Sequence, residues 1–296
     1  MKSVRAFETY HPLTLFAFFA CALVICMFTL HPVLLAVCYL SGVGFYGMLA
    51  GRRKLAASLA RSIPLTVLIA AVNPLFVHRG ETPLFFLNDN AVTLEAILYG
   101  AAAAVMLMSV FYWFKCYNEV MTSDKFIYLF GRVLPKLSLI LSMALRFVSR
   151  FKRQYREIDD AQRAMGMYAS KSLTDRLRSA FRVFSALITW SLENSIETAD
   201  SMRARGYGLR GRTSYNNFFW RRRDGFMLAF IVLTAGAVIA LLSAGRAGFG
   251  YYPTVTPIGF SVYDLLCYGA LTVLLFMTVL LEMKEAVRWR YSLSKI

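Results

Sequence analysis

Glu157-Ile-Asp-Asp-Ala-Gln-Arg-Ala-Met-Gly166 is echoed forty residues later by Glu197-Thr-Ala-Asp-Ser-Met-Arg-Ala-Arg-Gly206. Five of the ten positions are identical, because glutamate, aspartate, arginine, alanine and glycine recur at the same spacing. Such a match indicates that the same local structure occurs twice in the chain. Both copies lie within residues 134–223, a long basic region between flanks that are apolar enough for a lipid bilayer. We expect the protein to meet a partner in this region.

Each copy follows apolar side chains spaced three, four or seven residues apart, which is the pattern of an amphipathic helix. Pro135 and Ser172 suit helix starts, and Gly206 and Gly208 supply a stop for the second helix. At ~1.5 Å per residue, helices of about thirty residues would each reach roughly 50 Å, and an antiparallel pair would form a platform. The stripes consist of Leu137, Ile140, Ala144, Phe147, Phe151, Tyr155, Ile158 and Met165, and of Phe181, Phe184, Ile188, Leu192, Ile196, Ala199 and Met202.

The composition excludes an ordinary soluble domain. Of the 296 residues, 58% are hydrophobic, and the mean hydropathy is positive. A net charge of +16 could indicate a nucleic-acid partner, but the basic residues border apolar segments, as they do in the cytoplasmic loops of membrane proteins. We therefore expect a membrane lipid environment and no nucleic acid.

Six apolar runs are long enough, or nearly so, to cross a bilayer, which predicts an all-α, polytopic integral membrane protein. Asn73-Pro74, near the end of the third run, is expected to break or kink it. We expect three parts: N-terminal transmembrane helices over 1–133, the two-helix region over 134–224 and C-terminal transmembrane helices over 225–296. The six runs are 13–30, 33–50, 63–77, 91–114, 226–243 and 261–281.

The basic residues also predict the orientation. If both termini face the cytoplasm, thirty-one of the thirty-three lysines and arginines lie inside, and only Arg79 and Arg246 lie outside. Residues 115–224 would then be cytoplasmic. Two basic residues precede the first apolar run, but that run continues into a second span, so we expect no cleavable signal peptide. This pattern suits a multi-pass membrane protein.

Enzyme motifs are missing from the sequence. There is no Gly-x-x-x-x-Gly-Lys-Ser/Thr loop, so energy from ATP must come from a partner. His11, His31 and His78 lack metal-ligand spacing, and we interpret them as residues at membrane boundaries. No serine, cysteine or aspartate carries a nucleophile motif. We therefore expect no catalytic residue, no metal site and no cofactor.

An ordered set of motifs resembles the transmembrane T component of energy-coupling factor transporters, which are vitamin and metal-ion importers of the ATP-binding-cassette (ABC) class. The resemblance covers most of the chain up to Thr213. Its motifs are His11-Pro-Leu-Thr14, Asn73-Pro-Leu-Phe76, Leu134-Pro-Lys-Leu137, Ala144-Leu-Arg-Phe147, Asp160-Ala-Gln-Arg-Ala-Met-Gly166 and Ser201-Met-Arg-Ala-Arg-Gly-Tyr-Gly208.

The resemblance implies that two Ala-Arg-Gly-like triplets end two cytoplasmic coupling helices and contact ATPases. The second triplet is Ala204-Arg205-Gly206, and the first departs from the pattern because Met165 stands where arginine is expected. Either Arg163 supplies the charge or that contact has become apolar. The implied coupling residues are Arg163, Ala164, Met165, Gly166, Arg203, Ala204, Arg205 and Gly206.

The resemblance further implies three partners: two cytoplasmic ABC ATPase subunits, each receiving one helix tip, and a small integral-membrane subunit that captures substrate. The protein itself would be the scaffold that transmits ATP-driven motion to the capture subunit for uptake of a vitamin or metal ion. A self-contained secondary transporter is the alternative; it would need ionisable or unwound segments at mid-membrane, which the runs lack apart from Asn73-Pro74. A membrane-embedded enzyme comes third.

Overall fold

The computed structural model describes residues 6–77, 79–87, 90–131, 134–166, 172–207, 209, 218–245 and 248–293. The chain divides into two compact units. The membrane unit comprises Met1–Phe126 and Phe218–Ile296, and the helix-pair unit comprises Ile127–Asn217. The N-terminal and C-terminal apolar helices thus gather in one unit, although the whole of the other unit, Ile127–Asn217, separates them in the sequence.

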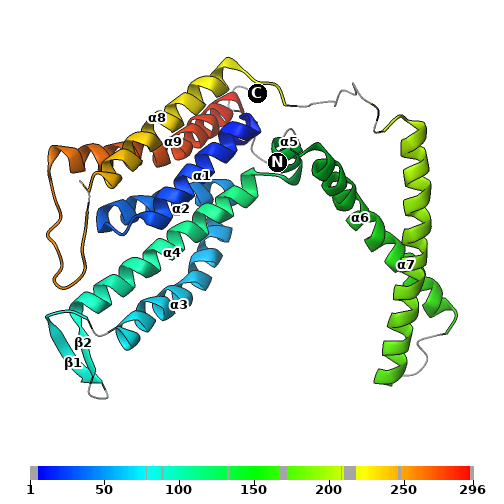
Figure 1. Cartoon of the computed structure of the whole chain (residues 1–296), viewed down its shortest axis with the longest axis horizontal. Helices are drawn as coiled ribbons and strands as arrows, with labels where there is room; N and C mark the ends of the chain where they lie inside the picture. Colours follow the sequence, from blue (N-terminus) through cyan, green and yellow to red (C-terminus); the bar gives the residue numbers. More distant parts are fainter. Residues whose placement is uncertain are drawn as a thin grey trace. The chain divides into compact units, whose positions relative to one another are not determined.

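The membrane unit is a helical bundle, as the apolar runs predict (Figure 1). Within the described residues, five of its helices are long and apolar enough to cross a membrane, and the sixth, α1, is a shorter apolar helix of 17 residues. The expectation of about six spans therefore corresponds to five full-length helices and one short one. The helices are α1 (Pro12–Phe28), α2 (Pro32–Ala50), α3 (Arg52–Phe76), α4 (Leu94–Val120), α8 (Arg222–Ser243) and α9 (Val262–Leu293).

Helix α3 runs through Pro74, so the helix does not break at Asn73-Pro74, where the sequence predicts a break or a kink. Proline removes the one amide that would bond to the carbonyl four residues earlier, which here belongs to Ala70. That carbonyl faces α4 so closely that a Cβ on Gly100 would lie 2.5 Å from it. The Asn73 amide donates to the Ala96 carbonyl of α4 at 2.8 Å. Packing against α4 thus holds the end of α3 in helical form.

His11 and His31 each cap a helix that begins with proline. The Nδ1 atom of each ring accepts the amide of the residue two positions later, Leu13 or Val33, at 3.3 Å. Both histidines therefore lie at helix starts. His78 lies outside the described residues.

The segment between the third and fourth apolar runs contains part of a β-hairpin. Strand β1 (Pro83–Leu87) pairs antiparallel with β2 (Asn90–Thr93), and Phe86 lies opposite Ala91. Because Thr93 is in the strand, the fourth apolar run becomes helical only at Leu94, with Thr93 as the capping residue. The sequence analysis missed this hairpin.

The core of the membrane unit is aromatic. Trp113 and Tyr112 of α4 are fully buried, and Trp113 donates its ring N–H to the Cys38 carbonyl at 3.2 Å. The Trp113 ring packs against Phe18 of α1 and Phe45 of α2. By contrast, many large apolar side chains of α3, α8 and α9 point outward, as expected for surfaces in lipid.

The helix-pair unit contains the end of α5 (Ser123–Gly131), then α6 (Pro135–Ala164) and α7 (Leu173–Ala204). The starts at Pro135 and just after Ser172 agree with the sequence signals. The two helices cross, with Phe151 packed against Trp190 at a ring separation of 5.8 Å (Figure 1). They do not lie alongside each other over their full lengths, so the expected antiparallel platform is a crossed pair.

Candidate coupling site

The second triplet forms the end of α7. The Gly206 amide donates to the Arg203 carbonyl at 2.9 Å, and the Tyr207 amide donates to the Met202 carbonyl at 3.0 Å. These two bonds make a Schellman motif, which requires a left-handed residue after the last turn. Gly206 fills that position with φ +72°, a value that glycine reaches without steric cost. Gly206 is therefore the stop that the sequence predicts, while Gly208 lies outside the described residues.

The first triplet ends α6 in the same way. Gly166 has φ +74°, and its amide donates to the Arg163 carbonyl at 2.9 Å. The cap residues before the two glycines also match: Met165 has φ −77° and ψ 3°, and Arg205 has φ −84° and ψ 7°. The repeated sequence thus folds into a repeated tip, and Met165 occupies the position of Arg205.

Both cap residues are exposed, so each could contact a partner. Met165 is 61% exposed, and Arg205 is exposed as well. Within the described part of the chain, Arg205 forms no ion pair of its own, which leaves its guanidinium for external carboxylates or carbonyls. The thioether of Met165 offers mainly an apolar contact. The two tips therefore present different chemistry on the same backbone.

The arginines next to the triplets are engaged within their own helices. Arg163 binds Asp159 at 2.9 Å, with the Asp159 carboxylate largely covered and the Arg163 side chain 65% exposed. Arg203 lies 3.8 Å from Asp200, an exposed pair three residues apart. Asp159 is a residue that the sequence analysis missed, although its i,i+4 spacing to Arg163 could have identified it. This ion pair argues against Arg163 as a simple replacement for the missing arginine.

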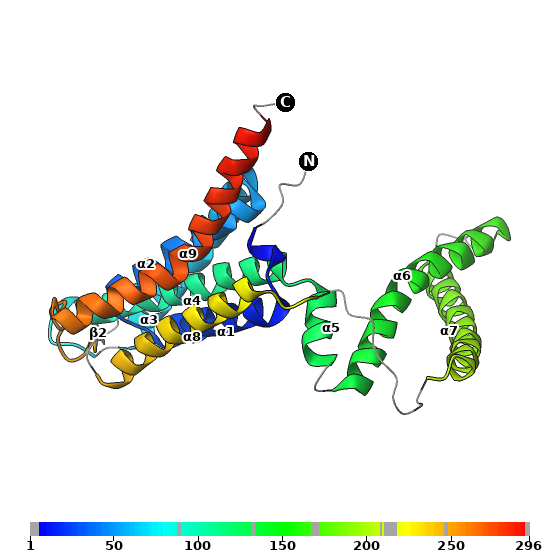
Figure 2. The same cartoon turned by 90° about the horizontal axis from the view of Figure 1, so that it is seen from above.

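The eight predicted residues form two separate tips rather than one site. The end of α6 and the end of α7 lie at different extremities of the helix-pair unit in both views (Figures 1 and 2). Ala164 and Ala204 are the last helical residues of their helices and are exposed. Their small side chains leave the cap residue and the glycine backbone open to a partner. The arrangement can engage two bodies at once.

An apolar surface lies between the tips. The predicted stripe is partly internal, because Phe147 stacks on Phe151 and Phe151 packs on Trp190. Its remainder is exposed, with Phe181 at 70% and Phe184 at 58%. A groove of about 430 Å³ opens on this surface; it is lined by Tyr155, Leu177, Ala180, Phe181, Phe184 and Leu187.

The comparisons with known proteins concern most of the chain. The family model described as cobalt transport protein (CbiQ) matches residues 3–215. The energy-coupling factor transporter transmembrane protein EcfT of Bacillus selenitireducens is 31% identical over 232 residues, which cover 74% of this chain and 86% of the relative. EcfT of Lactobacillus helveticus is 32% identical over 106 residues, covering 35% of this chain and 38% of the relative.

A third relative is named differently. An ABC transporter ATP-binding protein of Bifidobacterium longum, BL0043, is 28% identical over 191 residues, which cover 60% of this chain but only 24% of that protein. The family model spans well over half of this chain, and the Bacillus relative is matched over most of its length. The chain therefore belongs to the CbiQ/EcfT family and is the transmembrane coupling component of an energy-coupling factor transporter.

Proposed function

We propose that each of the two helix tips docks onto one of two cytoplasmic ABC ATPase subunits. The observation that carries this proposal is the repeated tip: two distant chain segments adopt the same helix ending and expose the residue before the glycine. Two equivalent docking points fit a pair of ATPases, whose closure would move both helices. The name of the Bifidobacterium longum relative, an ABC transporter ATP-binding protein, supports an ATPase in the same system.

The exposed apolar surface of the helix-pair unit is proposed to contact a small integral-membrane capture subunit. Phe181, Phe184 and Ile188 are each more than 40% exposed on α7. Such a surface is costly to leave in water, and a membrane protein partner or lipid would cover it. In this scheme, movement of α6 and α7 reorients the capture subunit, which carries the vitamin or metal ion.

The orientation that we propose places both termini and residues 115–224 in the cytoplasm of a prokaryotic cell. The charge asymmetry supports it, since Arg79 and Arg246 are the only basic residues assigned to the outside. Single cysteines at Gly248 and Ser172, both exposed, test this assignment on a cysteine-free background. A membrane-impermeant reagent applied to intact cells should modify the first and spare the second. Modification at Ser172 would contradict this orientation and support the opposite one.

Copurification tests the docking of the ATPases. A tagged chain extracted from its native membranes should bring down ABC ATPases, and Arg205→Ala should reduce their yield. Removal of an interfacial arginine leaves partner acceptors buried and unpaired, at a cost of about 2–5 kcal/mol. Arg203→Ala is the matched control, since Arg203 is equally exposed but lies over Asp200. Equal yields of ATPase with wild type and Arg205→Ala, at equal membrane insertion, would contradict the proposal.

A further inference from the structure

A short segment at the start of the described chain contacts five helices: α1, α2, α5, α8 and α9. Residues 6–11 contain a 3-10 turn, η1 (Phe7–Thr9), and the Phe7 side chain is fully buried. Its ring packs edge-on against Phe18 at 5.3 Å. Glu282 of α9, itself buried, accepts the amides of Ala6 at 3.2 Å and Phe7 at 3.1 Å. The segment is therefore held in place by packing of the buried Phe7 ring and by hydrogen bonds to the buried Glu282 carboxylate.

The first crossing from the membrane unit to the helix-pair unit is tied to this segment. That crossing follows Phe126, and the preceding residue, Lys125, is only 6% exposed. The Lys125 ammonium donates to the Glu8 carbonyl at 2.9 Å and to the Val120 carbonyl at 3.0 Å. The Glu8 carboxylate lies 3.9 Å away. Lys125 thus binds the end of α4 and the N-terminal segment at the same time.

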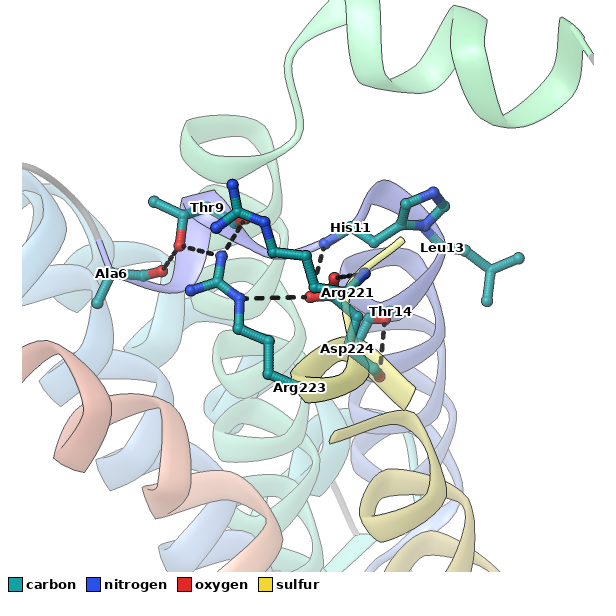
Figure 3. A network of polar contacts seen from close by, with 8 residues as sticks. All are labelled: Ala6, Thr9, His11, Leu13, Thr14, Arg221, Arg223 and Asp224. Carbon is teal, nitrogen blue, oxygen red and sulfur yellow. Dashed lines mark hydrogen bonds and ion pairs between the residues drawn. The ribbon is translucent and has the colours of Figure 1, made fainter. Parts of the chain in front are cut away.

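The second crossing is tied to the same segment (Figure 3). The chain returns at Phe218, and α8 begins with Arg222. The buried carboxylate of Asp224 accepts the His11 amide at 3.3 Å and the Arg221 amide at 2.9 Å. The Arg223 guanidinium donates to the Thr9 carbonyl at 3.0 Å and to its hydroxyl at 3.2 Å.

Further contacts close this junction. The Thr14 hydroxyl of α1 donates to the Asp224 carbonyl at 3.4 Å, and Arg223 lies 5.0 Å from the centre of the Tyr10 ring. Asp224 caps its own helix through Arg221, a local role that needs no other helix. The bonds from His11 and Thr14, more than two hundred residues away in sequence, go beyond that capping role. The start of α8 is thus fastened to the start of α1.

We propose that residues 6–11 form a clasp that holds together both points where the chain passes between its two units. Lys125, Asp224 and Glu282 are its positioning residues, because each is a buried charged side chain bound to this segment. This inference rests on the proposed function, in which the helix-pair unit is moved by ATPases. Because the clasp holds both crossings to the same segment, movement of the helix-pair unit is transmitted to α1, α4, α8 and α9 together. Without the clasp, one crossing could move independently of the other.

A pair of spin labels measures the clasp directly. Thr122 and Arg222 are exposed residues next to the two crossings, and cysteines there can be labelled after the five native cysteines are replaced by alanine. In the complete transporter, the clasp predicts one narrow distribution of distances that does not change when a non-hydrolysable ATP analogue is added. With Lys125→Met or Asp224→Asn, the distribution should broaden or shift with nucleotide.

Amide hydrogen exchange provides a second measurement on the same preparations. The amides of Phe7 and His11 are bound by Glu282 and Asp224, so Lys125→Met and Asp224→Asn should speed exchange over residues 6–11 by at least about ten-fold. Lys284→Met, at an exposed position of α9, is the matched control and should change neither measurement. If the buried variants fail to insert, Arg223→Met removes an exposed contact and should show the same change to a smaller degree.

Two results would overturn the clasp: wild-type distances that change with nucleotide, or variants whose distances and exchange match wild type. Copurification of ATPases separates this outcome from failure of the proposed function. A broken clasp should leave the ATPase yield at the wild-type level, since Lys125 and Asp224 lie outside the helix tips. If no ATPase copurifies with wild type, the proposed function fails, and the distances and exchange in the chain alone still decide whether the segment holds the two crossings.

Discussion

The ends of α6 and α7 share a backbone and differ in one side chain. Their cap residues agree within 10° in both φ and ψ, and the following glycines adopt φ +74° and φ +72°. One tip presents the apolar Met165, and the other presents the cationic Arg205. The comparison separates two properties of a docking helix: glycine sets the shape of the tip, while the residue before it sets the chemistry and strength of the contact.

The largest effect is expected from charge reversal at the second tip. Arg205→Glu should lower affinity for an ATPase by more than the roughly thirty-fold to several-thousand-fold loss expected for removal of a paired interfacial arginine. Met165→Glu places the same charge on the matching backbone and should cost less, because no charged contact is lost there. ATPase pulldown at equal membrane insertion measures both. Wild-type binding by Arg205→Glu would remove the second tip from the interface.

Valine in place of either tip glycine should impair docking by disturbing the helix end. A β-branched residue in the left-handed region costs roughly 1–2 kcal/mol or more at each site. Gly206→Val should be the worse of the two, because its Cβ would lie 3.1 Å from Leu209 Cδ1, whereas no atom of the described residues lies within 4 Å of a Cβ at Gly166. Thermal stability and pulldown of the two variants test this order. Equal losses of stability and docking in the two variants would show that backbone strain, and not the contact with Leu209, determines the effect.

Restoration of arginine at the first tip should strengthen that contact. If the two tips dock alike, Met165→Arg adds a charge-assisted hydrogen bond of about 1.5–3 kcal/mol to a matching acceptor. The expected result is a higher ATPase yield under dilute or high-salt washing. A lower yield would mean that the partner presents an apolar pocket to Met165, and the asymmetry between the tips would then be a property of both proteins.

The smallest effect is expected at Arg163. Its exposed side chain already pairs with Asp159, and such intrahelical surface pairs contribute only about 0–1 kcal/mol. Arg163→Ala should therefore reduce helix stability slightly and leave the ATPase yield close to wild type. A loss comparable to that of Arg205→Ala would instead show that Arg163 supplies the charge missing at Met165. Asp159→Ala, which removes the pair and keeps the arginine, is the matched control.

Local features of the fold were readable from the sequence. Each apolar run became a helix because a segment in lipid must satisfy its own backbone hydrogen bonds. Pro135 and Gly206 marked a helix start and a helix end, since both act through their own backbone dihedrals. These predictions needed no knowledge of distant partners.

Other features depended on neighbours that the sequence does not identify. Pro74 was expected to break or kink α3; the helix does not break there, because contact with α4 keeps the segment helical. The hairpin of β1 and β2 was missed in a segment whose turn residues suggested only a loop. The crossing of α6 and α7 through Phe151 and Trp190 was not expected either, because an amphipathic stripe shows which face is buried but not at what angle.

By itself, the sequence determined the elements, their order and the two glycine-ended tips, because these follow from backbone geometry and hydrophobic periodicity over a few turns. The tertiary structure alone decided which charged residues are buried and what they bind. Lys125, Asp224 and Glu282 meet residues 6–11 across more than one hundred positions of the chain. A buried charge requires a partner, but its spacing in the sequence does not say which one. Only the packing of α5, α8 and α9 around residues 6–11 brings these groups together.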